Sequence, residues 1–231
     1  MTPNPAPSRG SLQAVLIDMD GTLVDTEPYW FAAEHRLVAE FNGSWSDEQA
    51  HALVGNALPE SGRILRDVGG VQLDPAEIVE RMLDDVIAAA RHKMPWRPGA
   101  IELLAELRKA GVPCAMVTMS YARLASALVA QLPEGAFDAV VTGDEVAHGK
   151  PHPEAYLTAA ARLGVDPAAC VAIEDSPTGV ASAEAAGCVV VAVPHHVGID
   201  AAPGRTVLAG LEELTLDRLE RLVNAGPRAV P

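Results

Sequence analysis

The sequence has few basic residues. It contains 17 lysines and arginines against 31 aspartates and glutamates, which gives a net charge of -14. Such a charge repels the phosphates of nucleic acids and anionic membrane surfaces. We therefore expect no nucleic acid and no membrane among its partners. An anionic ligand would have to be held by metal ions, backbone N–H groups and a few placed cations.

Cysteines and long apolar runs are scarce as well. Cys114, Cys170 and Cys188 show no C-x-x-C spacing, so we interpret them as buried free thiols of a protein in a reducing, cytoplasmic compartment. The longest apolar run, at residues 188–193, is far too short to span a bilayer. Residues 1–11 are rich in proline and small residues and lack the apolar region of a signal peptide, so we expect a flexible tail.

Apolar segments of strand length alternate with helical patterns along most of the chain. Hydrophobic residues make up 49% of the 231 residues, which excludes the disordered class. The strands predicted from the apolar runs are residues 14–17, 112–118, 139–142, 171–174 and 189–193. The helices predicted between them are residues 98–109, 153–163 and 177–186. This alternation predicts a Rossmann-like parallel α/β sheet that binds ligands beyond the carboxyl ends of its strands.

One long stretch after the first predicted strand breaks this alternation. It reads as helical throughout, with apolar periodicity at residues 30–41 and 78–90. We interpret residues 28–96 as an inserted α-helical cap domain that lies over the site. The catalytic core would then consist of residues 12–27 and 97–231.

Two aspartates, Asp18 and Asp20, directly follow the first predicted strand. Residues two apart on an extended chain point the same way, so both carboxylates can face one phosphate. One carboxylate can attack phosphorus to form an aspartyl phosphate, while the other protonates the leaving oxygen and later deprotonates water. Taken alone, an Asp-x-Asp pattern more often marks a turn in which Asp and Gly suit the loop geometry.

Further motifs give the aspartate pair a context. Residues 18–22, Asp-Met-Asp-Gly-Thr, resemble motif one of the haloacid dehalogenase superfamily, in the subfamily with a small helical cap. Residues 117–120, 150–153 and 173–179 resemble motifs two, three and four in the family's order. The resemblance covers residues 12 to about 197, and the chain is similar to β-phosphoglucomutase-like sugar-phosphate phosphatases. It implies a Mg²⁺-dependent phosphatase.

The resemblance also implies a role for each matching residue. Asp18 would be the nucleophile and Asp20 the general acid and base. The residues that would bind phosphate are Thr118, Met119, Ser120 and Lys150. The residues that would bind Mg²⁺ are Asp18, Asp20 through its backbone carbonyl, Asp175, and Glu174 either directly or through water.

The sequence departs from the family pattern in motif two. Met119 stands where the family often has Asn or Ser. We expect the backbone N–H groups of Met119 and Ser120 to hold the phosphate in place of the missing polar side chain. The histidines lack a metal-like spacing, and we assign surface or loop roles to His148, His152, His195 and His196.

The sequence indicates the type of reaction more clearly than it indicates the substrate. The candidate substrate contacts in and beside the cap are Thr26, Trp30, Gly55 and Asn56. The leading hypothesis is a cytoplasmic monomer that hydrolyses a small phosphorylated metabolite, such as a sugar or polyol phosphate.

Two alternatives remain open. The first is a phosphomutase resembling β-phosphoglucomutase. Against it, Trp30 stands where those mutases have a His that assists proton transfer, and Leu58 where their cap has an Arg that holds a second phosphate. The second is a phosphate-sensing receiver domain, which needs a lone phosphoacceptor on a later strand and no cap.

Overall fold

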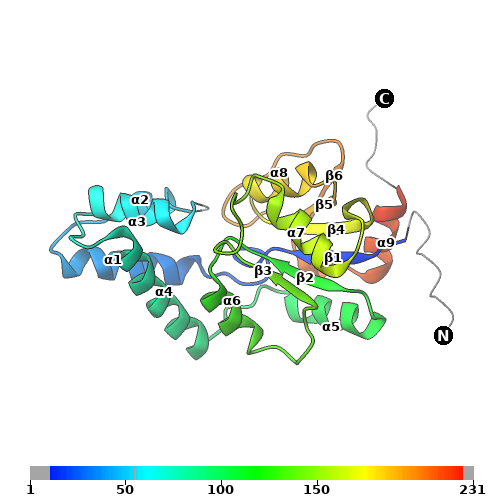
Figure 1. The fold of residues 1–231 in the computed structure, drawn as a ribbon, viewed down its shortest axis with the longest axis horizontal. Coiled ribbons are helices and arrows are strands. Elements are labelled where there is room, and N and C mark those ends of the chain that lie inside the picture. The colour runs from blue at the N-terminus through cyan, green and yellow to red at the C-terminus, as the bar shows by residue number, and fades with distance from the viewer. Residues whose placement is uncertain (1–10, 55, 226–231) are drawn as a thin grey trace.

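The computed structural model describes residues 11–54 and 56–225. Its centre is a parallel sheet with the strand order β3-β2-β1-β4-β5-β6 (Figure 1). The strands are β1 (Ala14–Ile17), β2 (Cys114–Val117), β3 (Ala139–Val141), β4 (Cys170–Glu174), β5 (Val189–Ala192) and β6 (Arg205–Val207). The first strand lies in the middle, where all four of its residues are buried. The predicted fold class is therefore confirmed.

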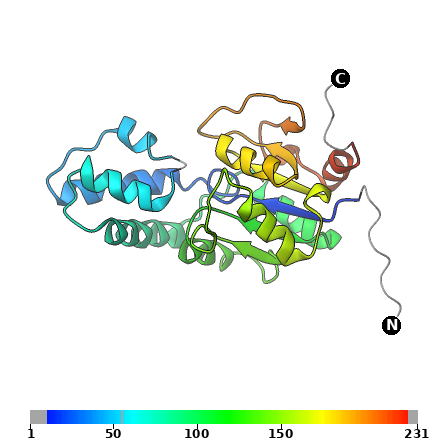
Figure 2. The ribbon, with the colours of Figure 1, turned by 45° about the horizontal axis from the view of Figure 1, so that its top comes forward.

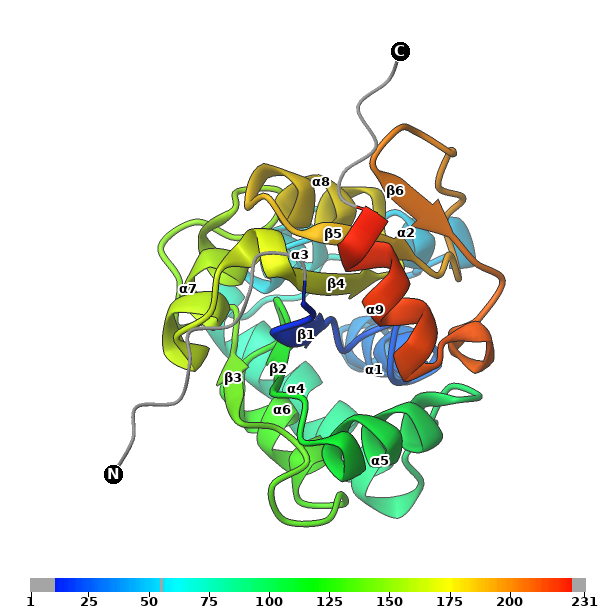
Figure 3. The same cartoon turned by 90° about the vertical axis from the view of Figure 1, so that its right-hand side faces the viewer.

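Helices cover both faces of the sheet, as a buried parallel sheet requires (Figure 3). The core helices are α5 (Ala100–Ala110), α6 (Ala122–Val129), α7 (Glu154–Leu163), α8 (Pro177–Ala185) and α9 (Leu216–Ala225). Two 3₁₀ helices, η1 (Pro167–Ala169) and η2 (Leu211–Glu213), complete the core. Alternate residues of β1 enter different layers: Val15 joins the apolar cluster that contains α5 and α9, and Leu16 joins the one that contains α7 and α8.

Among the described residues, four helices lie between β1 and α5, in the stretch predicted as the cap. They are α1 (Glu27–Glu40), α2 (Asp47–His51), α3 (Leu58–Asp67) and α4 (Pro75–His92). The cap extends beyond the carboxyl end of the sheet (Figure 2), with α1 and α3 both packed against α4. The two segments that connect cap and core run side by side, because Val24 pairs with Trp96 and the Asp25 N–H donates to Pro95 O at 2.9 Å.

The described helices include none with the length and apolar character needed to cross a membrane. The three cysteines are free and buried, as predicted. The predicted tail lies outside the described residues except for Ser11.

Candidate active site

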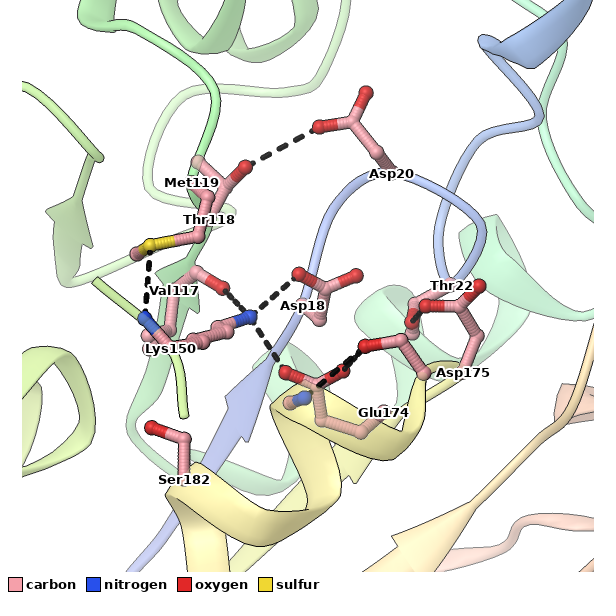
Figure 4. A network of polar contacts seen from close by, with 12 residues as sticks. Asp18, Asp20, Thr22, Val117, Thr118, Met119, Lys150, Glu174, Asp175 and Ser182 are labelled. Carbon is pink, nitrogen blue, oxygen red and sulfur yellow. Dashed lines mark hydrogen bonds and ion pairs between the residues drawn. The ribbon is translucent and has the colours of Figure 1, made fainter. Parts of the chain in front are cut away.

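Side chains from three neighbouring strands meet at the carboxyl edge of the sheet. Asp18 directly follows β1, Thr118 follows β2, and Glu174 ends β4. Because β1 lies between β2 and β4, these three residues are brought together although they are far apart in sequence. Lys150 reaches them from the loop before α7 (Figure 4).

The ammonium group of Lys150 connects the two acidic strands. Its Nζ lies 2.7 Å from Asp18 Oδ1 and 2.5 Å from Glu174 Oε1, and it also donates to Val117 O at 2.9 Å. The Lys150 side chain is only 5% exposed. Burial disfavours its charged form, but the carboxylates of Asp18 and Glu174 outweigh this effect and raise the pKa of Lys150. Lys150 therefore stays protonated and offsets the negative charge beside Asp18.

Glu174 is fully buried and fixed by several donors. Its Oε1 accepts from Tyr156 Oη at 2.6 Å, and its Oε2 accepts from Ser176 Oγ at 3.3 Å. Burial raises its pKa to about 7 against the opposing charge of Lys150. The carboxylate lies directly over the first turn of α8, where a Cβ at Gly179 would be 1.9 Å from Oε2. A larger residue at position 179 would displace Glu174 and, with it, Lys150.

The start of α8 follows the sequence prediction. Ser176 Oγ accepts from the Gly179 N–H at 3.1 Å, and Pro177 occupies the first helical position. The N-cap residue Ser176 directly follows Glu174 and Asp175. The start of α8 therefore fixes both acids at the turn between strand and helix.

Three carboxylates form a group that can hold a metal ion. Asp18, Glu174 and Asp175 each offer an oxygen, and these atoms lie within 4.8 Å of one another. Asp18 Oδ2 is buried and has no hydrogen-bond partner among the described residues. Burial, followed by the charges of Asp18 and Glu174, raises the pKa of Asp175 to about 9. Both the unpartnered oxygen and the mutual repulsion fit a site that binds a cation, and hard oxygen ligands suit Mg²⁺.

The Asp20 carboxylate faces the other side of the site. Its Oδ1 accepts from Thr26 Oγ1 at 2.5 Å, and its Oδ2 accepts from Ser120 Oγ at 2.7 Å and Thr118 Oγ1 at 3.2 Å. Burial raises the pKa of Asp20 even though these three hydrogen bonds favour the ionised form. A raised pKa keeps a proton available, which suits a general acid. The candidate substrate contact Thr26 thus touches Asp20.

In motif two, the backbone N–H of Ser120 differs from the sequence prediction. The Ser120 N–H donates to Thr118 Oγ1 at 2.9 Å, so this predicted phosphate donor already has a partner. The Met119 side chain turns toward the Lys150 loop, where its Sδ accepts from the Lys150 N–H at 3.2 Å. Met119 therefore helps to hold the backbone of Lys150 in place.

A pocket lies between the carboxyl edge of the sheet and the cap. Its core side includes Asp18, Asp20, Thr118, Lys150 and Asp175. On the cap side, the predicted residues Trp30 and Asn56 line it, whereas Gly55 lies outside the described residues. The pocket thus contains both the charged cluster and the cap residues that could contact a leaving group.

Two further residues of α1, Glu27 and Glu34, also line this pocket but were not among the predicted site residues. They are separated from Trp30 by three and four residues, so the three side chains share one face of α1. Carboxylates on the buried face of an amphipathic helix break its apolar pattern. This break in the apolar pattern was the sequence feature that could have indicated a role for Glu27 and Glu34 in the pocket.

The four histidines discussed above are exposed, as predicted. Two of them also contact an acid at the base of the cap: His195 Nε2 lies 3.3 Å from Asp25 Oδ2, and His196 Nε2 lies 3.0 Å from Asp25 Oδ1. The sequence did not predict this contact, because the loop after β5 meets the cap connection only in the folded chain.

Comparison with known proteins agrees with this geometry. The model of the haloacid dehalogenase-like hydrolase family matches residues 12–187. Hexitol phosphatase A of Escherichia coli is 37% identical over 215 residues, which cover 90% of this chain and 91% of that protein.

Solved structures show the same architecture. CbbY from Rhodobacter sphaeroides in complex with phosphate superposes with a TM-score of 0.79 at 28% identity, covering 87% of this chain and 96% of that one. A putative β-phosphoglucomutase from Thermotoga maritima superposes with a TM-score of 0.72 at 29% identity, covering 90% and 99%.

Proposed function

Because this chain belongs to the haloacid dehalogenase-like hydrolases, we propose that it hydrolyses a small phosphate monoester through an aspartyl phosphate on Asp18. The observation that carries this proposal is the environment of Asp18. One carboxylate oxygen is paired with Lys150, and the other is buried with no hydrogen-bond partner in the described part of the chain. The name of the E. coli relative, hexitol phosphatase A, supports a sugar or polyol phosphate as the substrate.

The carboxylate cluster fits a Mg²⁺ ion. Asp18 and Asp175 would bind it through side-chain oxygens, and Asp20 through its backbone carbonyl. Glu174, whose oxygens accept from Lys150, Tyr156 and Ser176, would act mainly by holding Lys150. When bound, Mg²⁺ supplies positive charge that lets an anionic phosphate approach an anionic nucleophile.

In the first step, an Asp18 carboxylate oxygen attacks phosphorus and the bond from phosphorus to the leaving oxygen breaks. Asp20 gives its proton to that oxygen, so the alcohol leaves neutral. Lys150 remains protonated and stabilises the charge on Asp18 and the transferred phosphoryl group. Thr26, Thr118 and Ser120 hold the Asp20 carboxyl in place.

In the second step, Asp20 takes a proton from a water molecule whose oxygen attacks the phosphorus of the aspartyl phosphate. The bond between phosphorus and Asp18 breaks, which releases inorganic phosphate and restores both carboxyl groups. The cap, residues 28–96, would close over the core, residues 12–27 and 97–231, and exclude bulk water from the phosphoenzyme.

The experiment that tests this function is a phosphate-release assay with purified protein, Mg²⁺ and a panel of phosphate esters. We expect release from sugar and polyol phosphates, which is lost on chelation and restored by Mg²⁺. Turnover that is equally fast in excess chelator, or no release from any monoester by a folded protein, would contradict the proposal.

A phosphomutase is the second candidate, favoured by the likeness to the putative β-phosphoglucomutase from T. maritima. The pocket argues against it. Trp30, which by resemblance takes the position of the mutases' His, lines the pocket and has an indole N–H but no basic nitrogen. Leu58, which by resemblance takes the position of the mutases' Arg, also lines the pocket and offers no cation for a second phosphate. Both features favour release of the product over its return to the phosphoenzyme.

A further inference from the structure

The cap side of the pocket contains two carboxyl groups that lack enough protein partners. Glu34 is 4% exposed, and its Oε2 accepts from Trp45 Nε1 at 3.0 Å. Its Oε1 has no hydrogen-bond partner among the described residues. Glu27, which is half-buried, has neither a hydrogen bond nor an ion pair in the described part of the chain. Neither carboxyl is among the buried side-chain groups of the described residues that lack a partner, so the free oxygens are accessible and can accept a ligand.

A ligand in the pocket would provide the missing partners. Glu27 and Glu34 both line the pocket that contains Asp18 and Lys150. They lie seven residues apart on α1, two helical turns, so they present two carboxyl groups in line along one face. A leaving group attached to a phosphate at Asp18 would extend toward this face.

The charge of the lining limits what the leaving group can be. Among the described residues that line the pocket, Lys150 is the one with a cationic side chain, and it is already paired with Asp18 and Glu174. The two arginines of α3, Arg63 and Arg66, are exposed and paired with Glu60 and Asp67. A second phosphate or a carboxylate at the cap end would be buried without a counter-charge, beside acidic groups.

We infer that Glu27 and Glu34 bind hydroxyl groups of the leaving group and select an uncharged sugar or polyol over a leaving group that carries a second anion. This inference rests on the proposed phosphatase function and deepens it. Hydroxyl groups both donate and accept hydrogen bonds. Burial raises the pKa of Glu27 to about 8 and that of Glu34 to about 7, so near neutral pH each carboxyl can donate as well as accept. That matches hydroxyl groups better than an ammonium group, which only donates.

The wild-type enzyme tests the charge rule with three substrates of one carbon skeleton: glucose 6-phosphate, glucose 1,6-bisphosphate and glucosamine 6-phosphate. We expect kcat/KM for glucose 6-phosphate to exceed that for the bisphosphate and for the amino sugar by about tenfold or more. Equal or faster turnover of the bisphosphate would overturn the inference. Faster turnover of glucosamine 6-phosphate would also overturn it, because the carboxylates would then recognise a cation.

Variants test the two residues themselves. Glu27→Gln and Glu34→Gln keep the shape of the side chain, but the amide never ionises and so cannot make the stronger charge-assisted hydrogen bonds that an ionised carboxylate accepts from hydroxyl groups. We expect each to lower the ratio of kcat/KM for glucose 6-phosphate to that for p-nitrophenyl phosphate, whose leaving group has no free hydroxyl, by about tenfold, mainly through KM. Glu48→Gln, an exposed change on α2, is the control that should leave the ratio unchanged.

The p-nitrophenyl phosphate assay separates the two levels of the argument. If the folded wild-type protein releases no phosphate from any monoester, the proposed function fails. If it hydrolyses p-nitrophenyl phosphate but the two Gln variants leave the substrate ratio at the wild-type value, the phosphatase stands and the inference about Glu27 and Glu34 is wrong.

Discussion

Gly21 lies directly against the carboxyl group of Asp175: a Cβ at Gly21 would be 2.0 Å from Asp175 Oδ2. The Gly21 backbone also has a φ of 80°, a conformation that favours glycine. The loop after β1 therefore needs a glycine for two separate reasons. One is backbone conformation, and the other is room for a carboxylate of the candidate metal site.

We predict that Gly21→Ala abolishes Mg²⁺-dependent activity by displacing Asp175. Gly187 provides a matched control, because its φ is 86° but a Cβ there meets nothing within 4 Å. Gly187→Ala should cost about 1 kcal/mol of stability from backbone strain alone and leave activity intact. Thermal unfolding with and without Mg²⁺ checks both variants. A Gly21→Ala protein that is stabilised by Mg²⁺ as strongly as the wild type would contradict this account.

The response to Mg²⁺ should grow with pH. Burial and the neighbouring carboxylates raise the pKa of Asp175 from 3.8 to about 9. Without metal, the folded protein then binds more protons than the unfolded chain. The protonated Asp175 carboxyl therefore contributes stability that is fully present below its pKa in the unfolded chain. This stability is lost as the pH rises through the pKa of Asp175 in the folded protein. Mg²⁺ needs the ionised form, so we expect a larger rise in Tm with Mg²⁺ near pH 9 than near pH 6.

Asp175→Asn is the control for this measurement. The amide does not titrate, so the metal-free variant should lose less stability with rising pH than the wild type, and Mg²⁺ should shift its Tm little. An Mg²⁺ effect that is the same at both pH values in the wild type would mean that the ion does not compete with protons at this cluster.

The role of Asp20 predicts a dependence on the leaving group. An alcohol needs a proton to leave, whereas p-nitrophenolate leaves without one. Asp20→Asn should therefore lower kcat for a sugar phosphate by about 10² or more, and kcat for p-nitrophenyl phosphate by a smaller factor in a single-turnover measurement. Equal losses with both substrates would remove the proton-donor role of Asp20.

Much of the fold was predictable because its signals are local. Strands such as β1 and β4 are short apolar runs buried on both faces, and Ser176 followed by a proline marks the start of α8. The short edge strand β6, only partly buried, has no such run and was not predicted. Helix α6, which packs against the cap helix α4, was not predicted either.

The residues of the site could be predicted from the sequence, but the ion pairs and hydrogen bonds between them could not. The sequence places acids at strand ends, yet nothing local shows that Lys150 pairs with both Asp18 and Glu174. The contact from the Lys150 N–H to Met119 Sδ also depends on how two distant loops pack. Pairings of this kind are set by the tertiary fold, so they appear only in the folded chain.

The distinction from a mutase can be measured directly. We expect the enzyme, given β-glucose 1-phosphate, Mg²⁺ and a bisphosphate primer, to form no glucose 6-phosphate in excess of the primer. The physical reason is the lack of a free cation for a second phosphate: among the described lining residues, Lys150 carries the one cationic side chain, and it is paired with Asp18 and Glu174. Rapid isomerisation without release of phosphate would overturn the phosphatase assignment.

The central claim is that Asp18 becomes phosphorylated during turnover. An acyl phosphate is reduced by borohydride to an alcohol, so quenching the enzyme during turnover with borohydride should convert Asp18 to homoserine, which peptide mass spectrometry locates. We predict this modification at Asp18 in the presence of substrate and Mg²⁺, and its absence without substrate. A folded Asp18→Asn protein should show neither the modification nor turnover. Reduction at a different residue, or wild-type turnover by Asp18→Asn, would contradict the account.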